Sequence, residues 1–402
     1  MKLFGELISF ETAREFIERH VLPVERTRSL KIDDALGCVL AEDIIARHYT
    51  PPFNRAAMDG YAVKSKDTVG ASKQNPKKLN LVGTLYAGST INGELSAGES
   101  IQISTGAPMP AGADAVVMLE NTEHTDNIVS IFKSASPLSN VALKGEDIKR
   151  GEIVLKRGMH LGAGKIGVLA SQGSRRCMVY EKPAVAILPT GEEIVETGRR
   201  LKAGQIYDIN SHTLSAVVKG NGGLPVIFST TGDNTESIKA NLDKALDNAD
   251  LVVISGGSSV GEKDLIIDVL EERGKVFFHG INIKPGKPTA FAIVKGKPVL
   301  CMPGYPTSCL INAYLLLGPA IRRMAHLPPG RSFSIQAKMG ARVTGGNGRR
   351  LSLPVRLEGE TAYPILKGSG AITGTAQADG YITVDEDKAY LEKDSLVKVI
   401  LF

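Results

Sequence analysis

The chain has 402 residues, of which 43% are hydrophobic and 23% charged, with four cysteines and a formal net charge of +5. This composition excludes a collagen-like, disordered or disulfide-stapled chain, and the length indicates two to four domains. The small net charge argues against a protein that coats nucleic acid, so we expect no nucleic-acid partner.

The first part of the chain predicts two helices separated by a β module. Ser9 can cap a helix that ends before Pro23. Short apolar runs divided by Gly and Pro, from about residue 50 to 139, are typical of strands, and a second helix is expected at 163–172. A module inserted between two halves of a first domain explains this order.

From residue 183 onward, strand-like apolar runs alternate with helical patterns, ending in a long helix expected at 307–325. Such alternation predicts a parallel sheet covered on both faces, in which ligands bind beyond the carboxyl ends of the strands. Residues 328–330 (PPG) are typical of a linker, and the remainder alternates without a helical period.

We therefore predict a multidomain α/β plus β fold, with a central three-layer α/β/α domain built on a mostly parallel sheet. An inserted mostly-β domain and a C-terminal β domain complete it. The expected boundaries are 1–46 with 142–181 for a discontinuous first domain with helices, 47–141 for the inserted domain, 182–327 for the α/β catalytic domain, and 328–402 for the C-terminal domain.

The cysteines and the apolar stretches indicate in which cellular compartment the protein is expected. The four cysteines form no CxxC pair, so they indicate neither a disulfide framework nor a structural zinc site. The N-terminus has no basic leader followed by an apolar run, and no apolar stretch is long enough to span a membrane. We expect a cytoplasmic protein without a membrane partner.

One stretch of the chain is strongly basic. Residues 274–357 hold thirteen Lys and Arg and no Asp or Glu, whereas the remainder holds 35 basic and 43 acidic residues. Surfaces normally mix both signs, so this bias favours an anion site over a merely solvated face. The aromatic residues of the stretch follow no repeating pattern, which favours small phosphorylated ligands over single-stranded nucleic acid.

A Gly- and Ser-rich loop follows the strand expected at 251–254. Small residues let a backbone approach a ligand closely, and N–H groups at a helix start attract anions. The loop is nearly a P-loop, but Glu262 stands where a P-loop has Lys, which argues against a nucleotide triphosphatase. The ligand-binding residues expected here are Ser255, Gly256, Gly257, Ser258 and Gly261.

Two proline-stiffened turns come next. Residues 284–288 (KPGKP) place two lysines on a turn that loses little conformational entropy when it binds an anion. Residues 303–306 (PGYP) repeat the device after the next predicted strand, just before a helix. Either turn alone could serve only to connect two elements, but two such turns after consecutive strands predict that both lie at the rim of one binding site.

Carboxylates also follow the predicted strands. Oxygen ligands of this kind suit a Mg²⁺ ion that bridges substrate phosphates. Each carboxylate alone is better explained as a helix cap or turn residue, but their shared position at one sheet rim favours a metal site. The candidates include Glu193, Asp208, Asp233 and Asp264.

Gly162, Gly164 and Gly167 spell GxGxxG, a pattern of dinucleotide-binding proteins. No clear strand precedes them, and no acidic residue follows about 20 residues later within a βαβ unit. We therefore favour a helix start over a nicotinamide site.

Seven motifs follow one another along the chain: 54–62 (NRAAMDGYA), 105–114 (TGAPMPAGAD), 189–193 (PTGEE), 204–210 (GQIYDIN), 255–264 (SGGSSVGEKD), 284–288 (KPGKP) and 303–306 (PGYP). In sequence and order they resemble the molybdopterin molybdenumtransferases, the MoeA family, which includes the C-terminal domain of gephyrin. Seven ordered motifs are far more specific than any single glycine pattern.

The resemblance implies an enzyme that inserts molybdate into adenylated molybdopterin with Mg²⁺ and releases AMP, forming molybdenum cofactor. It also implies a homodimer whose site is shared between subunits, and docking with the protein that adenylates molybdopterin. A tungstate-inserting homologue and a non-catalytic binding or scaffold protein on the same fold stay open as alternatives.

The resemblance also implies individual roles. Asp59 and Thr105 match residues that reach into the site from a partner subunit, and Glu193, Asp233 and Asp264 match acidic positions, with Asp264 the best candidate to bind the metal. The implied catalytic residues are Asp59, Thr105, Glu193, Asp233, Asp264 and Lys284. The implied binding residues are Ser255, Gly256, Gly257, Ser258, Gly261, Pro285, Gly286, Lys287, Pro303, Pro306 and Ser369.

Three positions depart from the family pattern. Gly280 stands where relatives often have a second lysine, Tyr305 stands where PGNP has its asparagine, and GGSSVG replaces GGVSVG. The preference between molybdate and tungstate therefore stays open.

Overall fold

The chain folds into two compact units. The computed structural model describes residues 7–89, 93–232, 234–256, 265–330 and 333–402. Unit 1 comprises Met1–Leu30, Gly37–Ala41 and Met178–Phe402, and unit 2 comprises Lys31–Leu36 and Glu42–Cys177. Strands β1 (Thr27–Lys31) and β12 (Arg176–Tyr180) lie where the chain passes from one unit to the other.

Unit 1 contains a six-stranded sheet that is mostly parallel, as predicted. Strands β16, β13, β17 and β21 pair in parallel, whereas β20 runs antiparallel to both of its neighbours. In spatial order the strands are β16 (Leu224–Ile227), β13 (Ala184–Pro189), β17 (Leu251–Ser255), β21 (Lys297–Met302), β20 (Ala290–Val294) and β18 (Gly274–His279).

Strand β20 was absent from the sequence prediction. It joins β21 through the two residues Lys295 and Gly296, whose φ angles are 49° and 76°. Two positive φ angles at the centre of a two-residue loop are typical of a tight hairpin turn. In the sequence, Gly296 is typical of such a turn, but Lys295 is not, because a lysine seldom adopts a positive φ. The hairpin was therefore not predicted.

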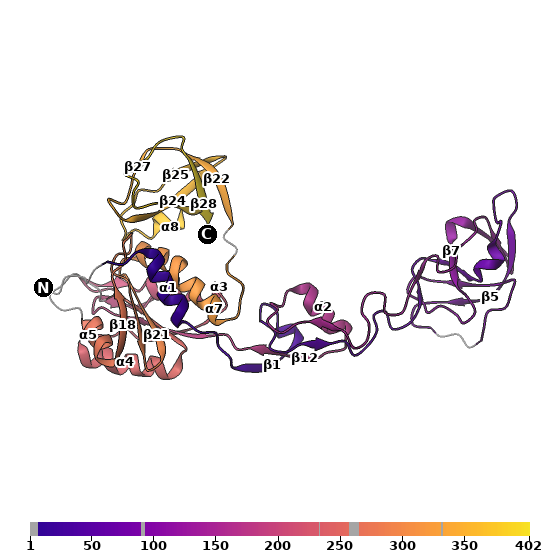
Figure 1. The fold of residues 1–402 in the computed structure, drawn as a ribbon, viewed down its shortest axis with the longest axis horizontal. Coiled ribbons are helices and arrows are strands. Elements are labelled where there is room, and N and C mark those ends of the chain that lie inside the picture. The colour runs from indigo at the N-terminus through magenta and orange to yellow at the C-terminus, as the bar shows by residue number, and fades with distance from the viewer. Residues whose placement is uncertain (1–6, 90–92, 233, 257–264, 331–332) are drawn as a thin grey trace. The chain divides into compact units, whose positions relative to one another are not determined.

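Helices cover both faces of the sheet, which confirms the predicted three-layer arrangement. Figure 1 shows α4 (Thr235–Asn248) and α5 (Leu265–Arg273) on one face, with α1 (Phe10–His20), α3 (Asn210–Gly220) and α7 (Gly318–Met324) on the other. Strand β13 serves both cores by alternation, because Val185 and Ile187 face the α1 side while Ala186 and Leu188 face the α4 side.

Helix α1 begins where the sequence predicts it, because Ser9 Oγ accepts a hydrogen bond from Thr12 N at 3.1 Å. Its apolar face buries Phe10, Ala13 and Ile17 in the core of unit 1. The four domain boundaries stay predictions.

The long helix predicted at 307–325 contains a wider turn. Helix α6 (Pro306–Asn312) passes through a π turn, η4 (Ala313–Leu317), into α7. Pro319 explains the change, because a proline lacks the N–H of a regular helix and its ring crowds the carbonyl four residues earlier.

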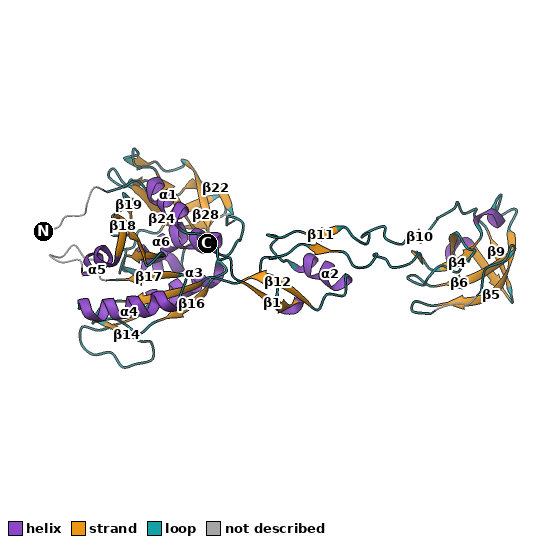
Figure 2. Ribbon diagram, turned by 60° about the horizontal axis from the view of Figure 1, so that its bottom comes forward, coloured by secondary structure: helices purple, strands orange, loops and turns teal. Residues whose placement is uncertain are grey.

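The C-terminal part of unit 1 is a closed barrel, which confirms the predicted β domain. Strand β24 pairs with both β25 and β26, and β25, β22, β28 and β26 complete the ring. Figure 2 shows its strands beside the α/β sheet. The elements are β22 (Ser334–Met339), β24 (Arg350–Glu358), β25 (Thr361–Pro364), β26 (Gly380–Val384), β28 (Leu396–Leu401), a ribbon of β23 (Val343–Thr344) with β27 (Tyr390–Leu391), and α8 (Thr373–Ala376).

Unit 2 is mostly β. Its six-stranded sheet has the order β7 (Ala115–Met118), β4 (Gly60–Val63), β6 (Glu99–Ile103), β5 (Lys77–Leu85), β9 (Ile128–Ile131) and β8 (Thr122–Thr125). Short ribbons pair β2 (Ile44–Ile45) with β11 (Ile153–Leu155) and β3 (Arg55–Ala56) with β10 (Val141–Ala142). Gly162 precedes α2 (Ala163–Ser171), and Gly164 and Gly167 lie inside that helix.

None of the helices in the described ranges combines the length and the apolar character needed to cross a membrane.

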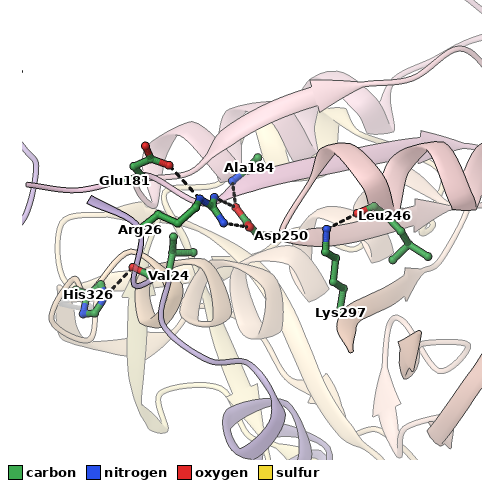
Figure 3. A network of polar contacts seen from close by, with 8 residues as sticks. All are labelled: Val24, Arg26, Glu181, Ala184, Leu246, Asp250, Lys297 and His326. Carbon is green, nitrogen blue, oxygen red and sulfur yellow. Dashed lines mark hydrogen bonds and ion pairs between the residues drawn. The ribbon is translucent and has the colours of Figure 1, made fainter. Parts of the chain in front are cut away.

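A charged cluster in unit 1 ties three distant segments together (Figure 3). Arg26 donates to both carboxylate oxygens of Asp250 at 2.8 and 2.9 Å and to Glu181 at 3.0 Å. Asp250 also accepts from Ala184 N at 2.9 Å, at the start of β13. Burial raises the pKa of Asp250, but the hydrogen bonds from Arg26 and Ala184 outweigh it and hold the pKa below 3.8.

We predict that Asp250→Asn lowers the free energy of unfolding by about 1–2 kcal/mol, because Arg26 loses a bidentate partner while staying partly solvated. Since the folded-state pKa is depressed, this difference should persist above about pH 4 and shrink as the pH falls below 3.8. Urea denaturation at several pH values measures it. The control Asp247→Asn, at an exposed position of α4, should change stability by less than about 0.5 kcal/mol. Equal effects of both variants would contradict this role of the cluster.

Candidate functional site

A cavity of about 1230 Å³ lies in unit 1, between the carboxyl ends of the parallel strands and the loops of the barrel. This is the end of an open α/β sheet at which ligands bind. The wall includes the ends of β13 and β17, the two proline-stiffened turns and the barrel loops. Ten of the predicted site residues line it: Glu193, Ser255, Gly256, Lys284, Pro285, Gly286, Lys287, Pro303, Pro306 and Ser369.

The other predicted residues fall into two groups. Gly257, Ser258, Gly261, Asp233 and Asp264 lie outside the described residues. Asp59 and Thr105 belong to unit 2 and meet there. No finding on the described residues tests the roles assigned to these seven positions.

The turn at 284–288 is held from beneath by the buried side chain of Asn312 on α6. Asn312 Nδ2 donates to Gly286 O at 3.1 Å and to Thr289 Oγ1 at 2.7 Å. Gly286 has a φ of 106°, and a Cβ at this position would collide with the Asn312 amide. The glycine therefore lets the turn close over Asn312 and present its lysines to the cavity.

The same turn is joined to the barrel. Strand β19 (Ile283–Lys284) pairs in parallel with β24, with Lys284 opposite Leu351. Asn282 Nδ2 donates to Gly348 O at 2.9 Å, and Arg350 N donates to Asn282 O at 3.1 Å. This pairing brings the barrel residue Arg349 to the same cavity as the turn.

Among the residues that the structure describes, the cavity wall carries more positive than negative charge. Its acidic side chains there are Glu193 and Asp208, and its basic ones are Lys284, Lys287, Arg342, Arg349 and Lys367, of which Arg342 also pairs with Glu392 at 3.5 Å. Cations gathered around one concave surface reinforce one another's field and attract phosphate more strongly than a single cation on a flat surface. The wall therefore favours a ligand with more than one negative group.

Only part of the basic stretch at 274–357 forms the wall of the cavity, so the predicted anion site is smaller than the stretch. Of its thirteen cations, four line the cavity. Others are engaged elsewhere: Lys295 pairs with Asp243 at 2.8 Å, Arg323 donates to Val21 O at 2.9 Å, and Arg356 pairs with Glu358. A charge count along the chain does not separate these structural pairs from the cations that face the cavity.

Asn210 joins the end of β17 to the turn that contains Gly304 in the cavity wall. Its Nδ2 donates to Ser255 Oγ and to Gly304 O, both at 2.8 Å, which fixes the orientation of the amide. Its Oδ1 is buried and accepts no hydrogen bond from the described residues. A buried amide oxygen without a donor is costly, so Asn210 Oδ1 is suited to accept a ligand group or to coordinate a cation.

The oxygen donors in the wall fit a hard cation such as Mg²⁺. They are Glu193, Asp208 and the Oδ1 of Asn210, and magnesium prefers oxygen ligands and keeps several waters. Asp208 also caps α3, since its Oδ1 accepts from Ser211 N at 2.9 Å. Within the described ranges, no group of three or more His, Cys, Asp and Glu could hold a metal ion by itself.

Cys309 is not a nucleophile of this site. It is fully buried under Ser255, with 4.0 Å between Cys309 Sγ and Ser255 Oγ. Burial raises the pKa of its thiol to about 12, so the thiolate is scarce at neutral pH. Ser255 Oγ itself accepts from Asn210 and has no histidine beside it among the residues lining the cavity.

In unit 2, Asp59 and Thr105 meet because their strands are neighbours. Asp59 precedes β4, Thr105 follows β6, and Gly60 lies opposite Ile103 in the sheet. Asp59 Oδ1 accepts from Thr105 N at 2.6 Å and from Thr105 Oγ1 at 3.0 Å. These two hydrogen bonds, the backbone one first, lower the pKa of the exposed Asp59 carboxyl. Asp59 is thus an oriented carboxylate on the surface of unit 2.

Sequence reasoning missed four residues of the wall as site residues: Asn210, Arg342, Arg349 and Lys367. Asn210 stood in a quoted motif, and the two arginines stood in the basic stretch. Lys367 could be suspected from the sequence only because it lies two residues before Ser369, which was predicted to bind the ligand. Their placement depends on how the barrel closes, which local patterns do not reveal.

Comparisons with protein-family models cover most of the chain. Residues 8–173 match the MoeA N-terminal region (domain I and II), residues 186–323 match a probable molybdopterin binding domain, and residues 336–402 match the MoeA C-terminal region (domain IV). The cavity described above lies between residues of the second and third matches.

Individual relatives agree with these models. A molybdopterin molybdenumtransferase of Staphylococcus epidermidis is 32% identical over 97% of this chain and 94% of its own. One from Haemophilus influenzae is 35% identical over 79% of this chain and 78% of its own. The crystal structure of a molybdopterin biosynthesis MoeA protein from Pyrococcus horikoshii has a TM-score of 0.85 and 40% identity, and the match covers 98% of this chain and 99% of that one.

We predict that Gly256→Ala disturbs the cavity wall. Gly256 has a φ of 100°, and a Cβ there would lie 2.6 Å from Thr190 O at the end of β13. The expected loss in the free energy of unfolding is about 1–3 kcal/mol. Gly368→Ala is the matched control, because Gly368 also lines the cavity and has open space around its Cα. Thermal denaturation that fails to distinguish the two variants would contradict the strained geometry of Gly256.

Proposed function

The chain belongs to the MoeA family, which includes molybdopterin molybdenumtransferases related to it over most of its length. We therefore propose that it inserts molybdate into adenylated molybdopterin and releases AMP. The product is molybdenum cofactor, and the reaction class is a transfer. Molybdate here is a substrate, distinct from the Mg²⁺ that assists the reaction.

The observation that carries this proposal is the cationic cavity at the carboxyl ends of the sheet strands. Adenylated molybdopterin carries a phosphoanhydride and molybdate is a second anion, so the ligands bring several negative charges to one place. The basic side chains in the described part of the wall match that demand, and two of them, Lys284 and Lys287, stand on a stiff turn. A volume of about 1230 Å³ also accommodates a dinucleotide-sized ligand.

The cavity supports catalysis by position and charge. Lys284 and Lys287 neutralise negative charge that grows on the leaving phosphate as the anhydride bond breaks. Asn312 and the pairing with β24 hold the backbone that carries these lysines, so the turn itself requires little reorganisation when the substrate binds. No side chain is needed as a covalent nucleophile, which agrees with the raised pKa of the Cys309 thiol.

We propose that a Mg²⁺ ion is held by Glu193, by Asp233 and Asp264, and by the oxygen atoms of Asp208 and Asn210 that share the wall with Glu193. When bound, the ion supplies Lewis-acid stabilisation of phosphate oxygens. Asn210 supports this proposal, because its fixed Oδ1 has no donor among the described residues.

We also propose that the active protein is a homodimer in which Asp59 and Thr105 of one subunit complete the cavity of the other. The geometry of Asp59 supports this role. Its carboxylate is exposed, lies directly before β4 and is oriented by two hydrogen bonds from Thr105, so it is available to contact another subunit. Docking of the adenylating protein remains a prediction from the family resemblance.

The insertion reaction can be tested by measuring AMP release from adenylated molybdopterin with Mg²⁺ and molybdate. Lys284→Ala is expected to slow release about 10–100-fold, since one hydrogen bond between charged groups contributes about 1.5–3 kcal/mol. Lys338→Ala is the control, because Lys338 is exposed on β22 away from the cavity. Absence of AMP release by the unmodified protein would refute the function, and an unchanged rate for Lys284→Ala would refute the role of the turn.

The shared site can be tested by mixing two variants. Asp59→Asn and Lys284→Ala should each be weak alone, but a mixed dimer retains one intact site if the site is shared between subunits. Random exchange of subunits should then restore about a quarter of the original activity. Light scattering measures the dimer. No recovery after proven exchange would mean that Asp59 and Lys284 do not act across two subunits.

A further inference from the structure

Tyr305 lies in the cavity wall with 67% of its surface exposed. Within the described part of the chain, its ring stacks on no other ring and its hydroxyl has no hydrogen-bond partner. An aromatic side chain gains free energy when its faces are covered, and tyrosine and tryptophan are therefore typical of binding surfaces. An uncovered ring that faces a ligand-sized cavity indicates a ligand that covers it.

The position of this ring is set by two parts of unit 1. Tyr305 precedes α6, and the barrel loop at 368–371 docks on the start of that helix through Thr307. Thr307 N donates to Ser369 O at 2.9 Å, and Thr307 Oγ1 donates to Ala371 O at 3.1 Å. A Cβ placed on Gly370 would lie 3.6 Å from Tyr305 Cδ1, so the neighbour of the ring in this loop has no side chain to cover it.

The surroundings specify the class of ligand. Lys284, Lys287 and Lys367 share the cavity with Tyr305, and Leu366 in the same wall is 73% exposed. A ring for stacking in the same cavity as several cations is the combination that binds a planar heterocycle joined to a phosphate. Phosphate alone would use the lysines and leave Tyr305 and Leu366 in water.

We infer that Tyr305 is a specificity-determining residue, on whose ring a planar heterocycle of the phosphorylated substrate stacks. The identity of that substrate rests on the proposed function. Its adenine and its pterin are two sources of the same chemistry. The chain has tyrosine where the family resemblance leads to asparagine, so the stacking surface distinguishes this protein from relatives with the PGNP turn.

Calorimetric binding of three probes tests the inference: AMP, a pterin phosphate and ribose 5-phosphate. Tyr305→Asn should weaken the binding of AMP or of the pterin phosphate about tenfold and leave ribose 5-phosphate unchanged, whereas Tyr305→Phe should keep all three within about twofold. The probe that is weakened identifies the ring. Tyr363→Asn, a partly exposed tyrosine of the barrel outside the cavity wall, should change none of them.

Three results would overturn the inference. The first is that Tyr305→Asn binds both ring probes as tightly as the unmodified protein. The second is an equal loss for ribose 5-phosphate, which would assign the effect to the turn and not to the ring. The third is that the unmodified protein binds neither ring probe more tightly than ribose 5-phosphate. None of these measurements uses molybdate or AMP release, so their failure and the failure of the proposed function are distinguishable.

Discussion

The cavity depends on the short parallel pairing between β19 and β24. Strand β19 belongs to the basic turn of the α/β domain, and β24 belongs to the barrel, so their register decides which barrel loops face the strand ends. With Ile283 opposite Arg350, the residue Arg349 and the loop that carries Lys367 share a wall with Lys284. The charge of the site is thus assembled from two domains, neither of which holds it alone.

Two asparagines keep this assembly rigid. Asn210 ties the last residue of β17 to the turn that contains Gly304, and Asn312 ties the basic turn to α6. Each amide nitrogen donates two hydrogen bonds, and each Oδ1 has no donor among the described residues. Polar networks inside a protein specify one arrangement of loops, which a site that works by charge and position requires.

The sequence predicted what local patterns determine. Apolar runs predicted the alternation of strands and helices from residue 183 onward and placed β17, and glycine and proline located the turns at 284–288 and 303–306. It could not predict the closure of the barrel, because the pairing of β24 with β26 joins residues far apart in the chain. For the same reason it overstated the basic stretch, since the pairing of Lys295 with Asp243 joins residues 52 positions apart and exists only in the fold. It also missed Asn210 and Lys367, whose relevance comes from the cavity.

Hydrogen exchange with and without adenylated molybdopterin tests most directly whether this assembled wall is the binding site. The account predicts that the ligand protects amides of the basic turn at 284–288 and of the barrel loop at 367–371 together, because both belong to one wall. Protection confined to one of these segments, or absent from both while the ligand is bound, would contradict it.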